Sequence, residues 1–164
     1  MQPMNRKYTF LSALLLSAGV VTFISCKDEE EVVDPPLVCG LPNGTIRWKE
    51  NGVEKCANAS IIADKGIILT INGLSAQGPT ITFELDSVSV GTHELTADYN
   101  YVLYTDGLAL AWEATNEQPG SITINSHNES TNRIEGTFQI NVVNPINGVS
   151  KSITDGQLSV TYTE

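Results

Sequence analysis

Apolar and polar residues alternate along the last third of the chain with the period of two expected for β-strands. In the run 132–143 the apolar residues of one parity are Ile134, Phe138, Ile140 and Val142. In the run 152–163 they are Leu158, Val160 and Tyr162. The pair Asn147-Gly148 separates the two runs and predicts a turn. Strands with one apolar and one polar face are typical of antiparallel sheets that bury one side.

Shorter runs of the same kind fill the middle of the chain. Asn51-Gly52 lies between runs at 46–48 and 53–62, and it favours a type I′ hairpin turn because both central residues need a positive φ. Asn72-Gly73 is expected to end another strand. The other expected strands lie near 67–71, 80–85, 92–97, 99–104, 108–114 and 121–124.

These elements predict one all-β domain. No stretch repeats its apolar residues with a helical period over a useful length. We expect an antiparallel β-sandwich, with a partly closed β-barrel as the alternative, because strand parity does not separate the two. Gly136 and the pair Asp155-Gly156 are interpreted as bulge or turn positions rather than as site residues.

Residues 1–25 have a different pattern, that of a secretory signal. Arg6 and Lys7 precede the uncharged, largely apolar stretch 8–24. A retained membrane-spanning helix is the weaker alternative, because such a helix needs about 20 apolar residues. This stretch is shorter and is interrupted by polar or small residues: Ser12, Ser17, Gly19 and Thr22.

Cys26 directly follows that stretch and predicts lipidation. Phe23-Ile24-Ser25-Cys26 resembles a bacterial lipobox, with a small residue before the Cys and Phe23 in place of the usual Leu. The resemblance implies cleavage before Cys26 and attachment of a diacylglycerol, with acyl chains such as palmitate. Two acyl chains would anchor the protein stably to a membrane.

An acidic segment follows the predicted anchor: Lys27, Asp28, Glu29, Glu30 and Glu31. A Lys followed by acidic residues resembles the export signal of Bacteroidota-type lipoproteins. The resemblance implies an outer-membrane protein whose domain faces the cell surface. The alternative is a solvated acidic spacer, since like charges extend a linker. Residues 26–38 are thus expected to be a linker, stiffened by Pro35-Pro36, and residues 39–164 the domain.

Charge and cysteines narrow the function further. Without Arg6 and Lys7 the chain keeps seven basic against 19 acidic residues, a formal charge of −12. This balance argues against a nucleic-acid partner. Cys39 and Cys56 remain as an even pair, and in an exported protein such a pair predicts a structural disulfide.

Three segments of the domain resemble a known family. They are GSITI at 120–124, RIEGTF at 133–138 and SITDGQL at 152–158. The pattern is similar to a family of small Bacteroidota-type lipoproteins of unknown function. Glu135 and Leu158 stand where that family usually has Ser and Phe. The resemblance implies an all-β domain on a lipid anchor and implies no particular activity.

No residue pattern indicates catalysis or a bound cofactor. His93 and His127 lie far apart, and neither belongs to a recognisable nucleophile or zinc motif. Glu84 and Asp86 share a strand face and leave open a glycosidase-like carboxylate pair. Three acidic residues leave open an irregular Ca²⁺ site: Asp98, Asp106 and Asp155. We expect no catalytic residues, no metal and no cofactor.

The aromatic residues allow two interpretations. They are Trp48, Tyr99, Tyr101, Tyr104 and Trp112. Packing in the core is the favoured one, and stacking against sugars is the other. The sequence therefore predicts a non-enzymatic, lipid-anchored envelope protein with a binding or structural domain and an envelope-protein or glycan partner. The alternatives are a small glycan-processing hydrolase and a carrier of a small apolar ligand.

Overall fold

The computed structural model describes residues 38–108 and 110–164. The predicted signal peptide, Cys26 and the export signal at 27–30 lie outside these residues. The described part contains eleven strands and no helix, and so none that could cross a membrane. The strands are β1 Gly44–Glu50, β2 Val53–Cys56, β3 Ser60–Lys65, β4 Leu69–Leu74, β5 Thr80–Leu85, β6 Gly91–Leu95, β7 Tyr101–Thr105, β8 Ala111–Glu113, β9 Gly120–Asn128, β10 Arg133–Val143 and β11 Ser150–Thr161.

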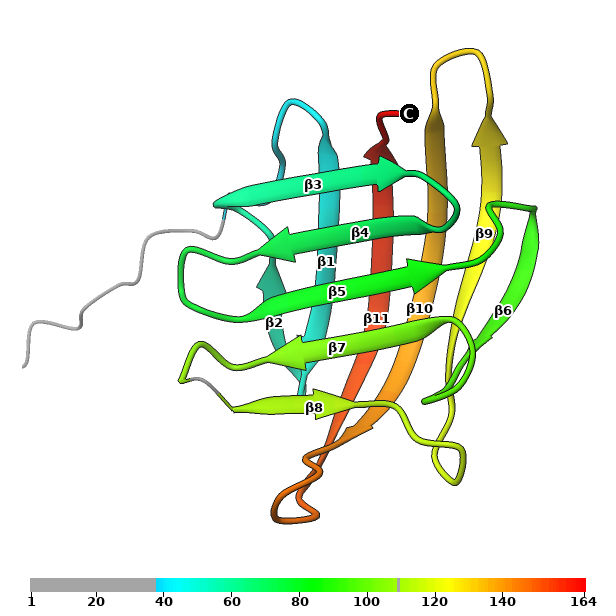
Figure 1. Cartoon of the computed structure of the whole chain (residues 1–164). Helices are drawn as coiled ribbons and strands as arrows, with labels where there is room; N and C mark the ends of the chain where they lie inside the picture. The colour runs from blue at the N-terminus through cyan, green and yellow to red at the C-terminus, as the bar shows by residue number, and fades with distance from the viewer. Residues whose placement is uncertain (1–37, 109) are drawn as a thin grey trace, which may run out of the picture. The chain divides into compact units, whose positions relative to one another are not determined.

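All strands belong to one antiparallel sheet that curls over itself into a half-barrel. The first layer has the order β8-β7-β5-β4-β3, and the second has the order β6-β9-β10-β11-β1-β2. Figure 1 shows the strands of the first layer running across those of the second. The layers join where Val143 of β10 pairs with Glu113 of β8. Near the other edge, Asp64 forms an isolated bridge to Thr163.

The inward faces of both layers form one continuous core. Phe83 of the first layer meets Phe138 of the second, with ring centroids 4.9 Å apart. Tyr104 lies between Trp48 and Trp112 at 6.3 and 6.2 Å. The predicted antiparallel all-β fold is therefore confirmed. The two packed layers are those of a sandwich, and the continuous hydrogen-bonded sheet gives the half-barrel.

Local turn chemistry explains most strand boundaries. Asn51 and Gly52 have φ values of 51° and 81°, as the predicted hairpin between β1 and β2 requires. The expected strand at 53–62 is wrong as one element, because it breaks after Cys56 into β2 and β3. The turn predicted at Asn72-Gly73 is also wrong, since both residues lie inside β4. A Cβ on Gly73 would lie 2.9 Å from Ile46 Cδ1, so the missing side chain makes room for the core.

The predicted bulges are present in the second layer. Pairing of β10 with β9 shifts register between Glu135 and Gly136. Pairing of β11 shifts register beside Asp155, which has a φ of 52°. A Cβ on Gly156 would overlap the ring of Phe138, so only glycine fits opposite that ring.

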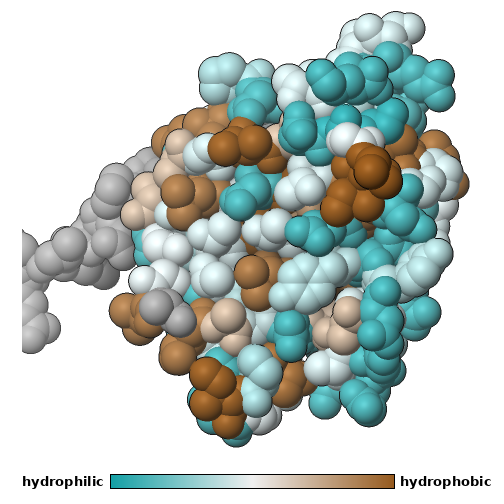
Figure 2. Space-filling view, viewed as in Figure 1, coloured by the Kyte–Doolittle hydropathy of each residue, from teal (hydrophilic) through white to brown (hydrophobic). Residues whose placement is uncertain are grey.

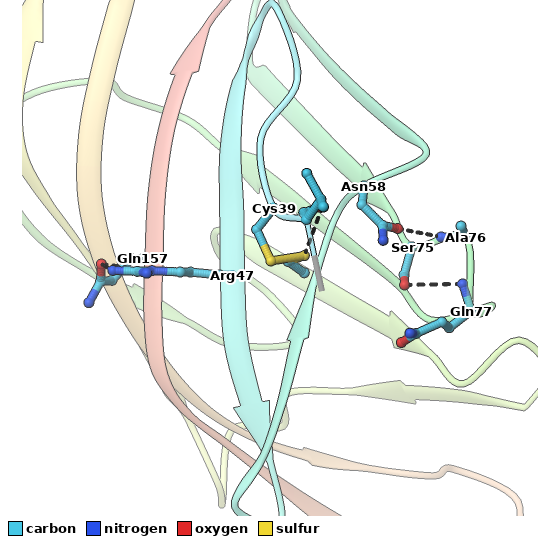
Figure 3. The surroundings of a disulfide bond; sticks show 9 residues. Cys39, Arg47, Asn58, Ser75, Ala76, Gln77 and Gln157 are labelled. Atoms are coloured by element: carbon cyan, nitrogen blue, oxygen red, sulfur yellow. Dashed lines mark hydrogen bonds between the residues drawn. A yellow bond between two sulfur atoms is a disulfide. The ribbon is translucent and has the colours of Figure 1, made fainter. Parts of the chain in front are cut away.

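A disulfide joins Cys39 to Cys56, with the two Cα atoms 5.7 Å apart. It ties the segment before β1 to the end of β2, as the sequence predicts (Figure 3). In the chain-entropy model a bridge across a loop of this length stabilises the fold by about 3 kcal/mol.

Candidate functional site

The outer face of the second layer is hollowed into a groove of about 650 Å³. Polar side chains line it and come mostly from four neighbouring strands, β9, β10, β11 and β1, and Glu54 of β2 lines it as well. We call it the polar groove and define it by eight residues: Arg47, Lys49, Ser121, Thr123, Thr137, Gln139, Asp155 and Gln157.

Strand register arranges these side chains in rows. Thr123 pairs with Thr137, Thr137 pairs with Gln157, and Gln157 pairs with Arg47. Ser121 pairs with Gln139 and begins a second row beside the first. Neighbouring strands lie about 4.8 Å apart. The rows therefore present hydroxyl, amide and guanidinium groups at regular intervals across the strands.

The bulges explain why this face is hollow. Bulges bend a strand and increase its twist. In the second layer they interrupt the pairing of β11 with β1 and with β10, and of β10 with β9. The floor of the groove is formed by three buried residues of the same strands: Trp48, Phe138 and Gly156. A bent, tightly packed layer thus carries a concave polar surface.

Two smaller hollows continue the groove along the same face. One of about 360 Å³ shares Arg47, Thr137 and Gln157 with it. Another of about 410 Å³ shares Ser121 and Gln139. Because the hollows share walls, the outer face of the second layer offers one elongated surface, which suits an extended ligand better than a compact one.

Charges in the polar groove are distributed unequally. Lys49 Nζ forms an ion pair with Asp155 Oδ2 at 2.9 Å. The hydrogen bond and charge of Asp155 raise the pKa of Lys49 above its usual value, with a smaller contribution from Glu54. Arg47 instead donates from Nε and Nη2 to Gln157 Oε1 at 3.1 and 2.6 Å. Figure 3 shows Arg47 and Gln157 pointing towards each other.

A second polar cluster lies where the two layers meet. Lys151 Nζ is 2.5 Å from Glu50 Oε1 and 3.9 Å from Asp106 Oδ2, and all three side chains are mostly buried. Tyr104 donates from its hydroxyl to Glu50 Oε2 at 2.9 Å. The ammonium group also lies 4.1 Å from the ring centroid of Trp112. We call these five residues the buried ionic cluster; it links β1 and β11 to β7 and β8.

The cluster has the features of a structural link. Burial, followed by the hydrogen bond to Glu50, raises the pKa of the Tyr104 phenol above its usual range. The neutral phenol therefore serves as a permanent donor to Glu50. Lys151 is already occupied by two carboxylates and two aromatic rings. The charged groups of the cluster are thus paired with one another, and this pairing holds the layers together.

A third polar region lies on the outer side of the first layer. A hollow of about 470 Å³ there is lined by Tyr99, Tyr101 and three acidic residues: Glu84, Asp86 and Asp98. Tyr99 is 67 % exposed. Tyr101 donates to Glu113 Oε2 at 3.1 Å, and burial, then this bond, raises its pKa to about 12. The other three aromatic candidates, Trp48, Tyr104 and Trp112, are in the core.

The two histidines have separate partners. His93 Nε2 lies 2.8 Å from the carbonyl oxygen of Ser89. His127 Nε2 lies 2.8 Å from the Tyr162 hydroxyl, in the second layer. Across 38–108 and 110–164 no group of three His, Cys, Asp or Glu side chains is placed to hold a metal ion.

Each of the three aspartates considered for a Ca²⁺ site contacts a different residue. Asp98 accepts from Asn116, Asp106 faces Lys151, and Asp155 faces Lys49. The shared Ca²⁺ site that the sequence left open therefore has no support among the residues that the structure describes. Each carboxylate has a separate partner on another segment of the chain.

The sequence did not single out the polar groove. Its outward-facing residues alternate with the core residues in the same strands, and that parity was the available signal. The rows depend on register across four strands, which parity alone does not give. The partners of Lys151 were missed for the same reason, because Glu50 lies 101 residues away in the sequence.

Comparison with known proteins gives one finding. No curated protein and no solved structure matches the chain. A family model for a domain of unknown function, DUF6252, matches residues 49–160. The match includes β2 to β10, most of β11 and the whole buried ionic cluster. Because it covers well over half of the 164 residues, the chain belongs to this DUF6252 family of uncharacterised β-domains.

Proposed function

We propose that this protein is a lipid-anchored, non-enzymatic binding protein of the cell envelope that holds a glycan chain in the polar groove. The single observation that carries the proposal is the groove itself. Its volume is about 650 Å³, and neighbouring hollows of about 360 and 410 Å³ extend it along one face. Hydroxyl and amide side chains in rows match the many hydroxyl groups of a sugar chain.

The chemistry of the groove favours binding over catalysis. Of the two carboxylates that line the hollow, Asp155 is engaged by Lys49 at 2.9 Å, and the other, Glu54, comes from β2 outside the eight defining residues. A glycosidase needs two carboxyl groups facing each other across the bond that is cleaved. The groove has instead mainly neutral donors and acceptors, which hold a ligand without transferring protons.

The packed interior favours the outer face over a lumen as the binding place. The core between the layers contains large fully buried side chains, among them Trp48, Phe83 and Tyr104. A carrier of an apolar ligand needs an enclosed cavity of several hundred Å³. The aromatic contacts between the layers occupy that space.

The envelope location is proposed from the sequence. The lipobox-like segment ending at Cys26 and the acidic segment after it resemble those of surface lipoproteins of Bacteroidota-type bacteria. The Cys39–Cys56 disulfide supports export, because such bridges persist outside the reducing cytosol. We infer an outer-membrane anchor through lipid on Cys26, with the domain facing outwards.

The binding function is tested with the full mature chain in detergent. Affinity electrophoresis against a panel of neutral, amino-sugar and uronic-acid polysaccharides should show retardation by at least one of them. Thr137→Trp places a large ring in the groove and should abolish that retardation. Thr82→Trp is the matched control, since Thr82 also faces outwards but on β5 of the other layer. Equal binding by both variants, or no retardation by any polysaccharide, would contradict the proposal.

The location is tested by protease treatment of intact cells that carry a C-terminal tag. We expect loss of the tag from intact cells and incorporation of labelled palmitate that Cys26→Ala abolishes. Protection of the tag until the outer membrane is broken would contradict the surface location. Labelling of the Cys26→Ala variant would contradict the anchor.

A further inference from the structure

Arg47 is the one basic residue of the polar groove that has no carboxylate partner. Lys49 is paired with Asp155, and just beyond the groove Arg133 is paired with Glu135 at 3.3 Å. Among residues 38–108 and 110–164, no carboxylate oxygen lies within ion-pair distance of the Arg47 guanidinium. Arg47 thus has no ion-pair partner, although the carboxylates of Glu54 and Asp155 line the same groove.

Gln157 holds Arg47 in a defined orientation. Both Nε and Nη2 of Arg47 donate to the single oxygen Oε1 of Gln157. A guanidinium group carries five N–H donors in a planar fork. The Nε–Nη2 edge is thus occupied by a neutral acceptor. The edge formed by Nη1 and the second N–H of Nη2 remains, and this edge has the spacing of a carboxylate.

The surroundings add selectivity to this edge. With its oxygen bonded to Arg47, the Gln157 amide keeps its N–H₂ group as a further donor in the row. Thr137 and Thr123 follow in the same row with hydroxyl groups. A ligand with a carboxylate on one unit and hydroxyl groups on the next would therefore find partners in the order in which the row presents them.

We propose that the polar groove selects glycans that carry carboxylate groups, such as chains of uronic acids, and that Arg47 binds the carboxylate end-on. This inference rests on the proposed glycan-binding function and names its ligand class. Long-range attraction does not assist it, because the mature chain has a formal charge of −12. Binding of a polyanion would consequently report a specific contact.

The probe is an oligogalacturonate, a chain of sugar carboxylates, compared with the same oligosaccharide after methyl esterification. Esterification removes the charge and leaves the rings and their hydroxyl groups in place. Calorimetry with the full mature chain in detergent should show that the free acid binds about tenfold to a hundredfold more tightly, the range of one charge-assisted hydrogen-bonded contact.

Variants at Arg47 assign that preference. Arg47→Gln should bind the acid and the ester equally, and Arg47→Lys should keep part of the preference, because it retains charge without the fork. Arg133→Gln is the matched control: the charge change is the same, but Arg133 lies outside the polar groove and bonds Glu135 and Ser159, which line the neighbouring hollow. It should leave the preference intact.

Each outcome has one meaning. If wild-type protein binds the ester as well as the acid, the carboxylate inference is overturned while the glycan function stands. If neutral polysaccharides bind and neither galacturonate form does, the inference is likewise overturned. If no polysaccharide of any kind binds, the proposed function fails and takes the inference with it. If polyglutamate binds as tightly as oligogalacturonate, Arg47 recognises carboxylates on any chain and the glycan class is wrong.

Discussion

The two layers of the half-barrel are built differently. In the first layer the strands are at most six residues long, and no pairing between them shifts register. In the second layer β9, β10 and β11 have nine, eleven and twelve residues, and three of its pairings are bulged. Long strands cannot curl over a small core without such irregularities.

The outer faces differ in consequence. The first layer presents a mixed surface, on which Figure 2 shows hydrophobic residues scattered among polar ones. Ile62 of β3 is 63 % exposed there, and Leu74 of β4 is 39 % exposed. The second layer presents the polar groove. The bulges that let the second layer curve over the core therefore also give its outer face the hollow shape of the proposed binding surface.

The largest expected effect comes from the glycines at the bends. Gly156→Ala should lower the free energy of unfolding by about 3 kcal/mol, because the added Cβ overlaps the Phe138 ring in a packed core. Gly136→Ala should cost a similar amount, since its Cβ would lie 2.5 Å from the backbone oxygen of Thr123. Urea unfolding followed by tryptophan fluorescence measures both.

Gly73→Ala is the counterpart in the first layer. Its Cβ would meet the tip of the Ile46 side chain, which is able to rotate away. We expect a loss of about 1 kcal/mol. If Gly73→Ala and Gly156→Ala lowered the free energy of unfolding equally, the proposed difference between the two layers would be contradicted.

The next effect concerns the link between the layers. Lys151→Met removes the cation and leaves Glu50 and Asp106 mostly buried without a partner, so we expect a loss of about 2 kcal/mol. Lys65→Met is the control, because its pair with Glu164 is more exposed and should contribute little to stability. Adding Glu50→Gln to Lys151→Met should recover part of the loss.

A result in which Lys151→Met and Lys65→Met cost the same would contradict this role for the buried ionic cluster. The layers would then be held together by the apolar core alone. Thermal unfolding of the two variants at one pH decides between these cases.

The smallest effect is a pH dependence in the first layer. The folded domain favours the neutral phenol of Tyr101, whose pKa is raised to about 12. The stabilisation is therefore fully present below the unfolded pKa of about 10 and is lost as pH rises towards the folded value. Urea midpoints of wild-type protein should fall more steeply over this range than those of Tyr101→Phe. Parallel curves would show that folding does not raise the pKa of Tyr101.

The sequence predicted the features that depend on neighbouring residues and missed those that depend on contacts between distant strands. The alternation over Thr80–Leu85, the turn at Asn51-Gly52 and the bulge at Asp155-Gly156 are local, and the structure confirms them. The turn predicted at Asn72-Gly73 was wrong because Gly73 is needed to make room for Ile46. The sequence alone does not distinguish such a glycine from one in a turn. The choice between packing and turn is made by a distant strand.

To predict the candidate site, one would need to know which distant strands pair with each other. Arg47 and Gln157 are 110 residues apart, and their contact follows from the pairing of the first long strand with the last. Outward parity marked both residues as solvent-facing. The antiparallel register of β1 and β11 places the guanidinium opposite the amide, and alternation within one strand does not record that register.

The central claim is that the concave outer face of the second layer, rather than the tyrosine-lined hollow of the first, is the binding surface. Amide-resolved NMR titration of the full mature chain with oligogalacturonate tests it most directly. We predict amide chemical-shift changes concentrated at Arg47, Thr137 and Gln157, with the amide signals of β4, β5 and β7 unchanged. Shifts concentrated around Tyr99 and Tyr101 instead would contradict it.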